Sequence, residues 1–116
     1  MMIMRKNQSI WLASAPIDFR KSIDGLCAIV QEQFEMLPHE GIFIFYNTAR
    51  NRIKILLWHN NGFLLIYKRF ETGKLFLKMT EDEKVSIKPD QLNWLILGVD
   101  WITLSSENTC EFKEYS

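Results

Sequence analysis

The chain has 116 residues, of which 47% are hydrophobic and 13% aromatic, with only 5 Gly and 3 Pro, a composition that excludes intrinsically disordered and collagen-like proteins. This length supports one hydrophobic core, so we expect a single domain over residues 9–104 between a flexible segment, 1–8, and a polar tail, 105–116. The formal net charge is zero, but Lys and Arg predominate before residue 79 and Asp and Glu after it.

Signals for export or membrane insertion are too short in this sequence. The apolar patch behind Arg5 and Lys6 spans only residues 10–13, whereas an export signal needs roughly 7 to 15 apolar residues. No apolar run approaches the roughly 18 residues of a membrane-spanning helix. Cys27 and Cys110 lack metal-type spacing, which indicates two reduced thiols, and we expect a cytoplasmic protein.

The first elements in chain order are a short strand and an amphipathic helix. Residues 9–13 predict a strand that ends before Pro16, whose ring fixes φ and removes a backbone donor. Apolar residues then recur at the three- and four-residue steps of one helix face. They are Ile23, Leu26, Cys27, Val30 and Phe34. We expect Asp18 or Ser22 to cap the first amides of this helix.

A β-meander is predicted to follow the helix. Residues 41–46 are apolar on both alternations, as in a central buried strand. Residues 52–59 and 63–70 flank Asn60-Asn61-Gly62, which signals a hairpin because Asn and Gly tolerate positive φ.

Two short strands and a second helix complete the expected elements. Residues 75–79 and 85–88 predict the strands, and Pro89-Asp90 opens the helix. The expected fold class is α+β, in which an antiparallel β-meander sheet of about four to six strands carries two helices packed mainly on one face.

Alternation divides the side chains of the hairpin strands between two faces. The face expected to lie in the core carries Ile53, Ile55, Leu57, Leu64, Ile66 and Phe70, interrupted by Lys68. The other face is basic and aromatic toward one end, where it carries Arg52, Lys54, Tyr67 and Arg69. Toward its opposite end it is apolar and carries Leu56, Trp58, Phe63 and Leu65.

The basic part of this second face is a candidate phosphate-binding surface. Like charges side by side on a sheet destabilise it unless acids or an anionic partner offset them. Cations can hold a nucleic-acid backbone while Tyr67 or Phe76 stacks on bases. The alternative is an ordinary solvated face, because exposed strands are often lined by Lys and Arg.

Signatures of enzymes are missing from the sequence. The five glycines are isolated, so there is neither a phosphate loop nor a dinucleotide fingerprint. His39 and His59 have no second ligand at metal spacing, and we expect no metal or other cofactor. Asp18, Asp24 and Asp100 are carboxylates of the kind that two-metal chemistry needs, but helix capping explains Asp18 equally well, and we expect a non-catalytic protein.

Several motifs occur in an order and spacing that are specific. They are Asp18-Phe19-Arg20-Lys21 with Asp24-Gly25-Leu26, Arg52-Ile53-Lys54-Ile55-Leu56 with Trp58 and Gly62, Tyr67-Lys68-Arg69 with Gly73, and Leu97-Gly98 with Trp101. With these motifs the chain resembles the TnpB accessory proteins of the insertion sequence 66 family over residues 9–104. The resemblance implies a small bacterial protein that is required, beside a separate transposase, for movement of the element.

The resemblance and the sheet face together lead to one functional hypothesis. It is a non-catalytic accessory protein of transposition that contacts the DNA backbone. The candidate DNA-binding residues are Arg20, Lys21, Arg52, Lys54, Tyr67, Lys68 and Arg69. The alternative is a module that docks on the transposase without binding DNA, through Leu56, Trp58, Phe63 and Leu65. We expect no membrane or small-molecule partner.

Overall fold

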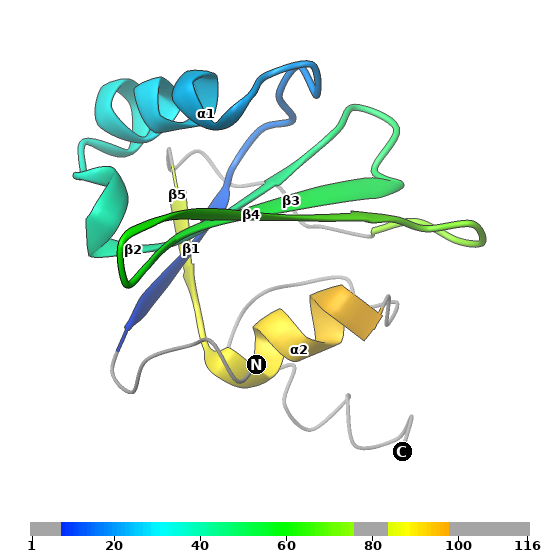
Figure 1. The fold of residues 1–116 in the computed structure, drawn as a ribbon. Coiled ribbons are helices and arrows are strands. Elements are labelled where there is room, and N and C mark those ends of the chain that lie inside the picture. Colours follow the sequence, from blue (N-terminus) through cyan, green and yellow to red (C-terminus); the bar gives the residue numbers. More distant parts are fainter. Residues whose placement is uncertain (1–7, 76–83, 98–116) are drawn as a thin grey trace.

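The computed structural model describes residues 8–75 and 84–97 (Figure 1). The elements in chain order are β1 (Ser9–Ala13), α1 (Ile23–Ile29), the π-helical turn η1 (Val30–Phe34), the 3-10 turn η2 (Pro38–Glu40), β2 (Gly41–Tyr46), β3 (Arg52–His59), β4 (Gly62–Arg69), β5 (Lys84–Ile87) and α2 (Pro89–Leu97). The described strands form one sheet in the order β4-β3-β2-β1-β5.

The sheet is mixed rather than antiparallel throughout. Strand β1 runs parallel to β2, with Ile10 opposite Ile42, whereas β2–β3, β3–β4 and β1–β5 are antiparallel pairs. The parallel pair arises because α1 and η1 return the chain from the end of β1 to the start of β2. The α+β class agrees with the prediction. The antiparallel meander holds for β2, β3 and β4 and is wrong for β1.

Three predicted strands differ in their bounds from the structure, and the one predicted over 63–70 is shifted by one residue, as β4 (Gly62–Arg69). The strand predicted over 75–79 lies outside the described residues except for Leu75, which is buried and belongs to no strand. The strand predicted over 85–88 begins one residue earlier, as β5, and ends at Ile87.

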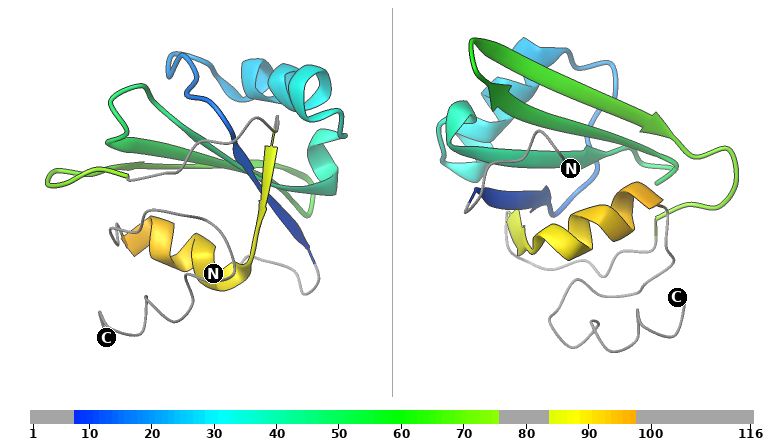
Figure 2. Two further views of the ribbon diagram at one scale, coloured as in Figure 1. Left: turned by 180° about the vertical axis from the view of Figure 1, so that it is seen from behind. Right: turned by 60° about the horizontal axis from the view of Figure 1, so that its bottom comes forward.

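The two helices lie on opposite sides of the sheet, with α1 above it and α2 below it in Figure 1 and the same separation in Figure 2. The prediction that both helices pack mainly on one face is therefore wrong. The physical reason is the apolar content of the central strands. All of β2 and residues 53–57 of β3 are buried, so both faces of the sheet need a cover.

The core on the α1 side is aromatic. Phe34 of η1 packs against Phe43 and Phe45 of β2, with ring centroids 5.6 and 5.8 Å apart, and all three side chains are fully buried. On the α2 side, Leu92 and Leu95 are fully buried. The sheet is therefore packed between a helical layer on each face, and the connecting loops lie at its ends.

The first helical segment lacks the predicted side-chain cap at its start and ends at a residue in the left-handed region. Ser22 is the N-cap residue of α1 but makes no side-chain cap, and the carboxylate of Asp18 accepts from the Arg20 amide instead, so neither residue caps the helix as predicted. At the far end, Glu35 turns the chain with φ 55°, and Nζ of Lys84 donates to the carbonyl of Phe34 at 2.7 Å. A cation at the carboxyl end of a helix is electrostatically favourable.

Candidate nucleic-acid interface

Three connecting segments meet at the end of the sheet where β2 and β4 finish and β3 begins. The amide of Ile17 donates to the carbonyl of Tyr46 at 3.0 Å, which attaches the segment before α1. The amide of Leu75 donates to the carbonyl of Arg50 at 2.7 Å, which attaches the segment after β4 to the turn between β2 and β3. Residues distant in sequence are thereby held next to one another.

The turn between β2 and β3 is organised by Asn47. Its Oδ1 accepts from the amides of Asn51 and Arg52, each at 3.0 Å, and its Nδ2 donates to Oδ1 of Asn51 at 2.7 Å. Arg50 lies in this turn in the left-handed region, with φ 61°. Because a non-glycine residue in that region needs support from its surroundings, the Asn47 bonds are part of what positions this turn.

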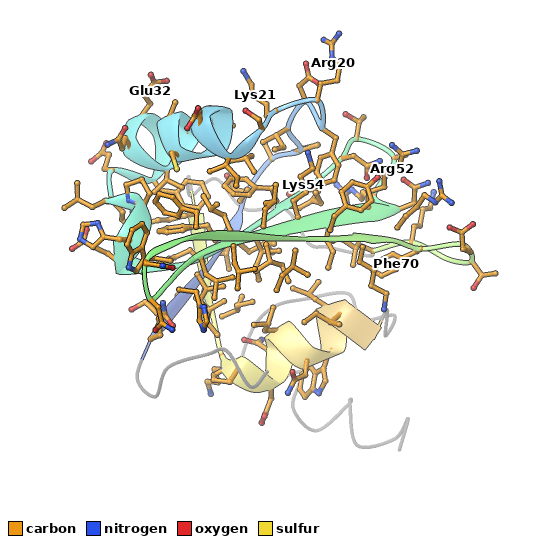
Figure 3. All side chains as sticks on the ribbon, in the orientation of Figure 1. Arg20, Lys21, Glu32, Arg52, Lys54 and Phe70 are labelled. Carbon is orange, nitrogen blue, oxygen red and sulfur yellow. The ribbon has the colours of Figure 1, made fainter. Side chains whose placement is uncertain are left out.

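We call the cationic residues of these segments the basic end. They are Arg20, Lys21, Arg50, Arg52, Arg69 and Lys74. The acids that the structure describes in the same segments, including the first turn of α1, are Asp18, Asp24 and Glu71. In Figure 3, Arg20 and Lys21 point away from the sheet above this end, and Glu32 lies at the opposite end of the helical segment. Positive charge therefore exceeds negative charge at the basic end.

Two of the arginines form ion pairs at the surface. Nη2 of Arg20 lies 2.7 Å from Oδ2 of Asp18, and Nε of Arg69 lies 2.6 Å from Oε2 of Glu71. Hydrogen bonding to Arg20 holds the pKa of the Asp18 carboxyl well below its usual range. The Arg20 side chain is nevertheless 91% exposed. Because exposed ion pairs contribute little free energy, a phosphate can compete with these carboxylates.

Arg52 and Arg69 lie directly opposite each other on β3 and β4. Their side chains therefore share the face of the sheet that α1 covers, a few ångströms apart at the Cβ atoms. The Nε of Arg52 is buried and has no hydrogen-bond partner in the part of the chain that the structure describes. A buried donor without an acceptor is unfavourable.

Lys54 lies on the same face but is buried, with 8% of its surface exposed. Its Nζ donates to the carbonyl of Phe19 at 2.7 Å and to that of Lys21 at 2.9 Å. Burial lowers the pKa of Lys54. The expectation that Lys54 stands exposed on a basic face is wrong, because the segment before α1 covers it and its charge is directed to two backbone carbonyls.

Lys68 lies on the other face of the sheet. It is opposite Ile53, and its Nζ donates to the carbonyl of Ile96 in α2. The same ammonium lies 5.3 Å from the centre of the Phe70 ring. Lys68 therefore joins the sheet to α2, on the core face that alternation predicts for it. It is not part of the surface that Arg52 and Arg69 share, although it is among the candidate DNA-binding residues.

Tyr67 is the exposed aromatic residue of the basic end. It is opposite Lys54, and 49% of its surface is exposed. Its ring centroid lies 5.9 Å from that of Phe19 at an interplanar angle of 58°, and Nζ of Lys54 lies 5.8 Å from it. Phe19 is not among the site residues that the sequence predicts. The sequence carries no sign of this contact, because it depends on how the segment before α1 folds over β3.

The apolar half of the same face is only partly accessible. Leu56 is fully buried, so the expectation that it lies on a partner-binding surface is wrong. Leu65 is partly buried beside it. Trp58 and Phe63 are half-buried and face each other at the hairpin, with ring centroids 5.0 Å apart at an interplanar angle of 82°.

A model of the IS66 Orf2-like protein family matches residues 8–106. The chain belongs to this family. Membership in the IS66 Orf2-like family associates the chain with the transposition of IS66 insertion sequences.

Its relatives in this comparison are uncharacterized. The protein y4jC of Sinorhizobium fredii is 31% identical over 93 residues, which cover 79% of this chain and 80% of that protein. The protein y4hO of the same organism is 29% identical over 97 residues, which cover 83% of this chain and 84% of that protein. No solved structure matches the IS66 Orf2-like chain.

Membrane-spanning helices and metal-binding clusters are both absent from residues 8–75 and 84–97 of this family member. No helix in these ranges is long and apolar enough to cross a membrane. No group of three or more His, Cys, Asp or Glu residues in the same ranges is arranged to hold a metal ion. The surface chemistry that the described residues do offer is the arginine-rich basic end with Tyr67.

Proposed function

We propose that this IS66 Orf2-like protein is a non-catalytic accessory factor of transposition that contacts the DNA backbone through its basic end. The observation that carries the proposal is the convergence of cations from separate segments, above all the pairing of Arg52 with Arg69 across β3 and β4. Such a factor would act in the bacterial cytoplasm, beside the element's transposase.

The chemistry of the basic end suits phosphate rather than base edges. Guanidinium groups bind phosphate oxygens through two parallel hydrogen bonds. The carboxylate of Asp18 accepts two such bonds from Arg20, and that of Glu71 accepts a single bond from Arg69. A phosphate that displaced either carboxylate would meet the same donors. Contacts of this kind orient a protein on DNA without reading its sequence.

The test is fluorescence anisotropy with labelled DNA across a series of salt concentrations. The wild type should bind at low salt and weaken steeply as salt rises, because binding releases counterions. Replacing Arg20, Arg52 and Arg69 by Gln should weaken binding and reduce the salt slope on duplex DNA by about 0.9 for every phosphate that the variant no longer neutralises. Lys88→Gln is the matched control, since Lys88 is exposed and lies before α2, outside the basic end.

Two outcomes would contradict the proposal. One is binding that stays constant as salt rises. The other is an Arg20/Arg52/Arg69 variant that remains folded by circular dichroism and binds DNA as tightly as the Lys88 variant does. These three arginines are suitable because none of them is among the buried residues of the core, whereas reversal of the Lys54 charge would place a buried carboxylate against two carbonyl oxygens.

The second candidate function is docking on the transposase, and the observation that favours it is the Trp58–Phe63 pair. Half-buried aromatic rings at a hairpin are the kind of residue that anchors protein interfaces. Trp58→Ala and Phe63→Ala should then abolish capture of the transposase in a pull-down while DNA binding persists. If both variants retain capture at wild-type levels, the docking surface lies elsewhere.

A further inference from the structure

We propose that Tyr67 stacks on an unpaired base, so that the basic end prefers single-stranded DNA to duplex DNA. This inference rests on the proposed function, because it assumes that the surrounding arginines hold a nucleic-acid backbone. It adds the class of DNA structure that the site selects and names the residue that makes the selection.

The first observation is that the Tyr67 ring is both exposed and held in place. Exposed large hydrophobic residues are rare in the described chain, where only Leu37 and Tyr67 qualify, each 49% exposed. The Phe19 ring and the Lys54 ammonium both contact the Tyr67 ring from within the protein. Lys54 in turn lies 4.9 Å from the centre of the Phe19 ring. A ring fixed in this way loses little conformational freedom when a ligand stacks on it.

The second observation is the position of the arginines around this ring. On β4, Arg69 follows Tyr67 by two residues and shares its face, and on β3, Arg52 precedes Lys54 by two residues in the same way. Two residues of a strand span about 7 Å, which long arginine side chains can cover. Arg20 is adjacent in sequence to Phe19 and is largely exposed. A base on Tyr67 would therefore have cations within reach of its own backbone phosphates.

The faces of the bases are accessible in single-stranded DNA but not in duplex DNA. In a duplex the faces of the bases are stacked on one another, so an exposed aromatic ring adds nothing to phosphate contacts. In a single strand each base can leave the stack and lie on an aromatic side chain, independently of sequence. The combination of a fixed exposed ring and phosphate-binding groups is therefore more useful for single strands than for duplexes.

The experiment compares binding of a single-stranded oligonucleotide and of its duplex at one fixed low salt concentration. The wild type should bind the single strand more tightly. Tyr67→Leu, which keeps an apolar side chain on the strand, should weaken single-strand binding by roughly 5- to 150-fold and thereby remove the preference for the single strand over the duplex. Tyr67→Phe, which keeps the ring, should retain single-strand binding.

A second measurement reports stacking directly. A single strand that carries the fluorescent base 2-aminopurine should change its emission on binding to the wild type and to Tyr67→Phe, and should change much less with Tyr67→Leu. Thermal unfolding of each variant must show an unaltered midpoint, so that unfolding is not mistaken for weaker stacking.

The outcomes separate this inference from the proposed function. Salt-dependent binding with equal affinity for single strand and duplex would overturn the inference and leave the proposed function standing. Absence of binding to either DNA would overturn both. If Tyr67→Leu abolishes capture of the transposase but leaves both DNA affinities unchanged, Tyr67 is a protein-binding residue and the inference is wrong.

Discussion

The Nζ of Lys54 donates a hydrogen bond to the backbone carbonyl of Phe19 at 2.7 Å, and this bond ties the middle of β3 to the segment before α1. A second bond from the same ammonium goes to the carbonyl of Lys21, so the backbone is fixed on both sides of Arg20. The position of Arg20 at the surface therefore depends on a lysine that is itself buried.

Replacement of Lys54 by Met should destabilise the protein by about 1–3 kcal/mol, because the carbonyls of Phe19 and Lys21 lose their donor while the volume of the side chain is largely kept. Urea unfolding measures the change. Lys88→Met, at an exposed lysine, is the matched control and should leave the unfolding midpoint unaltered. Equal midpoints for the two variants would show that the Lys54 bonds contribute nothing to stability.

Removal of the acids at the basic end should strengthen DNA binding. Asp18→Asn keeps the oxygen that accepts from the Arg20 amide but removes the negative charge that competes with phosphate. Glu71→Gln likewise removes the negative charge that is paired with Arg69. Each variant should bind DNA several-fold more tightly at low salt, and the gain should shrink as salt rises. Weaker binding by both, with fold intact, would mean that the arginines do not bind the DNA.

Asn47→Ala should disorganise the turn that carries Arg50 and leads into Arg52. The substitution leaves the amides of Asn51 and Arg52 without the oxygen that they share, which should cost about 1–3 kcal/mol. Asn47→Asp retains an acceptor at the same place and should cost less. Thermal or urea unfolding of the two variants gives the comparison, and an alanine variant as stable as the aspartate variant would refute the role of these bonds.

Tyr46 should make the fold sensitive to alkaline pH. Burial raises the pKa of Tyr46 to about 12, whereas an unfolded tyrosine ionises near ~10. The raised pKa means that the stabilising effect is complete below about pH 10 and is lost as pH rises toward about 12, because only the unfolded chain releases the proton in this window. The loss should amount to about 2–3 kcal/mol.

The measurement is urea unfolding of wild type and Tyr46→Phe between about pH 9 and about pH 12. Phe cannot ionise, so the difference between the two curves isolates Tyr46 from the lysines that titrate in the same range. If both proteins lose stability equally with rising pH, the Tyr46 hydroxyl does not carry the effect.

The faces of the hairpin strands were predictable from the sequence. Side chains alternate along a strand, and the Asn-Gly turn fixes which parities share a face, so Lys54 and Tyr67 were expected on the same face as Trp58 and Phe63. The observed register confirms that shared face. What covers a face does not follow from spacing. The burial of Lys54 depends on the segment before α1, which is distant in sequence.

The direction of β1 was not predictable for a similar reason. Residues 9–13 show only that a strand forms, and a helix between two strands permits either a parallel or an antiparallel pair. The direction follows from the return of the chain through α1 and η1 to the start of β2. Because β2 is apolar on both sides, α1 and α2 can cover opposite faces. Lys68 differs in this respect, since alternation along the strand predicts it on the core face, apart from Arg69, and the sheet confirms that face.

The place of β1 between β2 and β5 has a consequence for how the chain acquires its structure during synthesis. One edge of β1 can pair with β2 early. The other edge pairs with β5 (Lys84–Ile87), which leaves the ribosome much later. Pairings between such remote segments form slowly, and open strand edges attract other chains in the meantime. A premature stop codon before β5 should therefore yield an aggregating product rather than a smaller working domain.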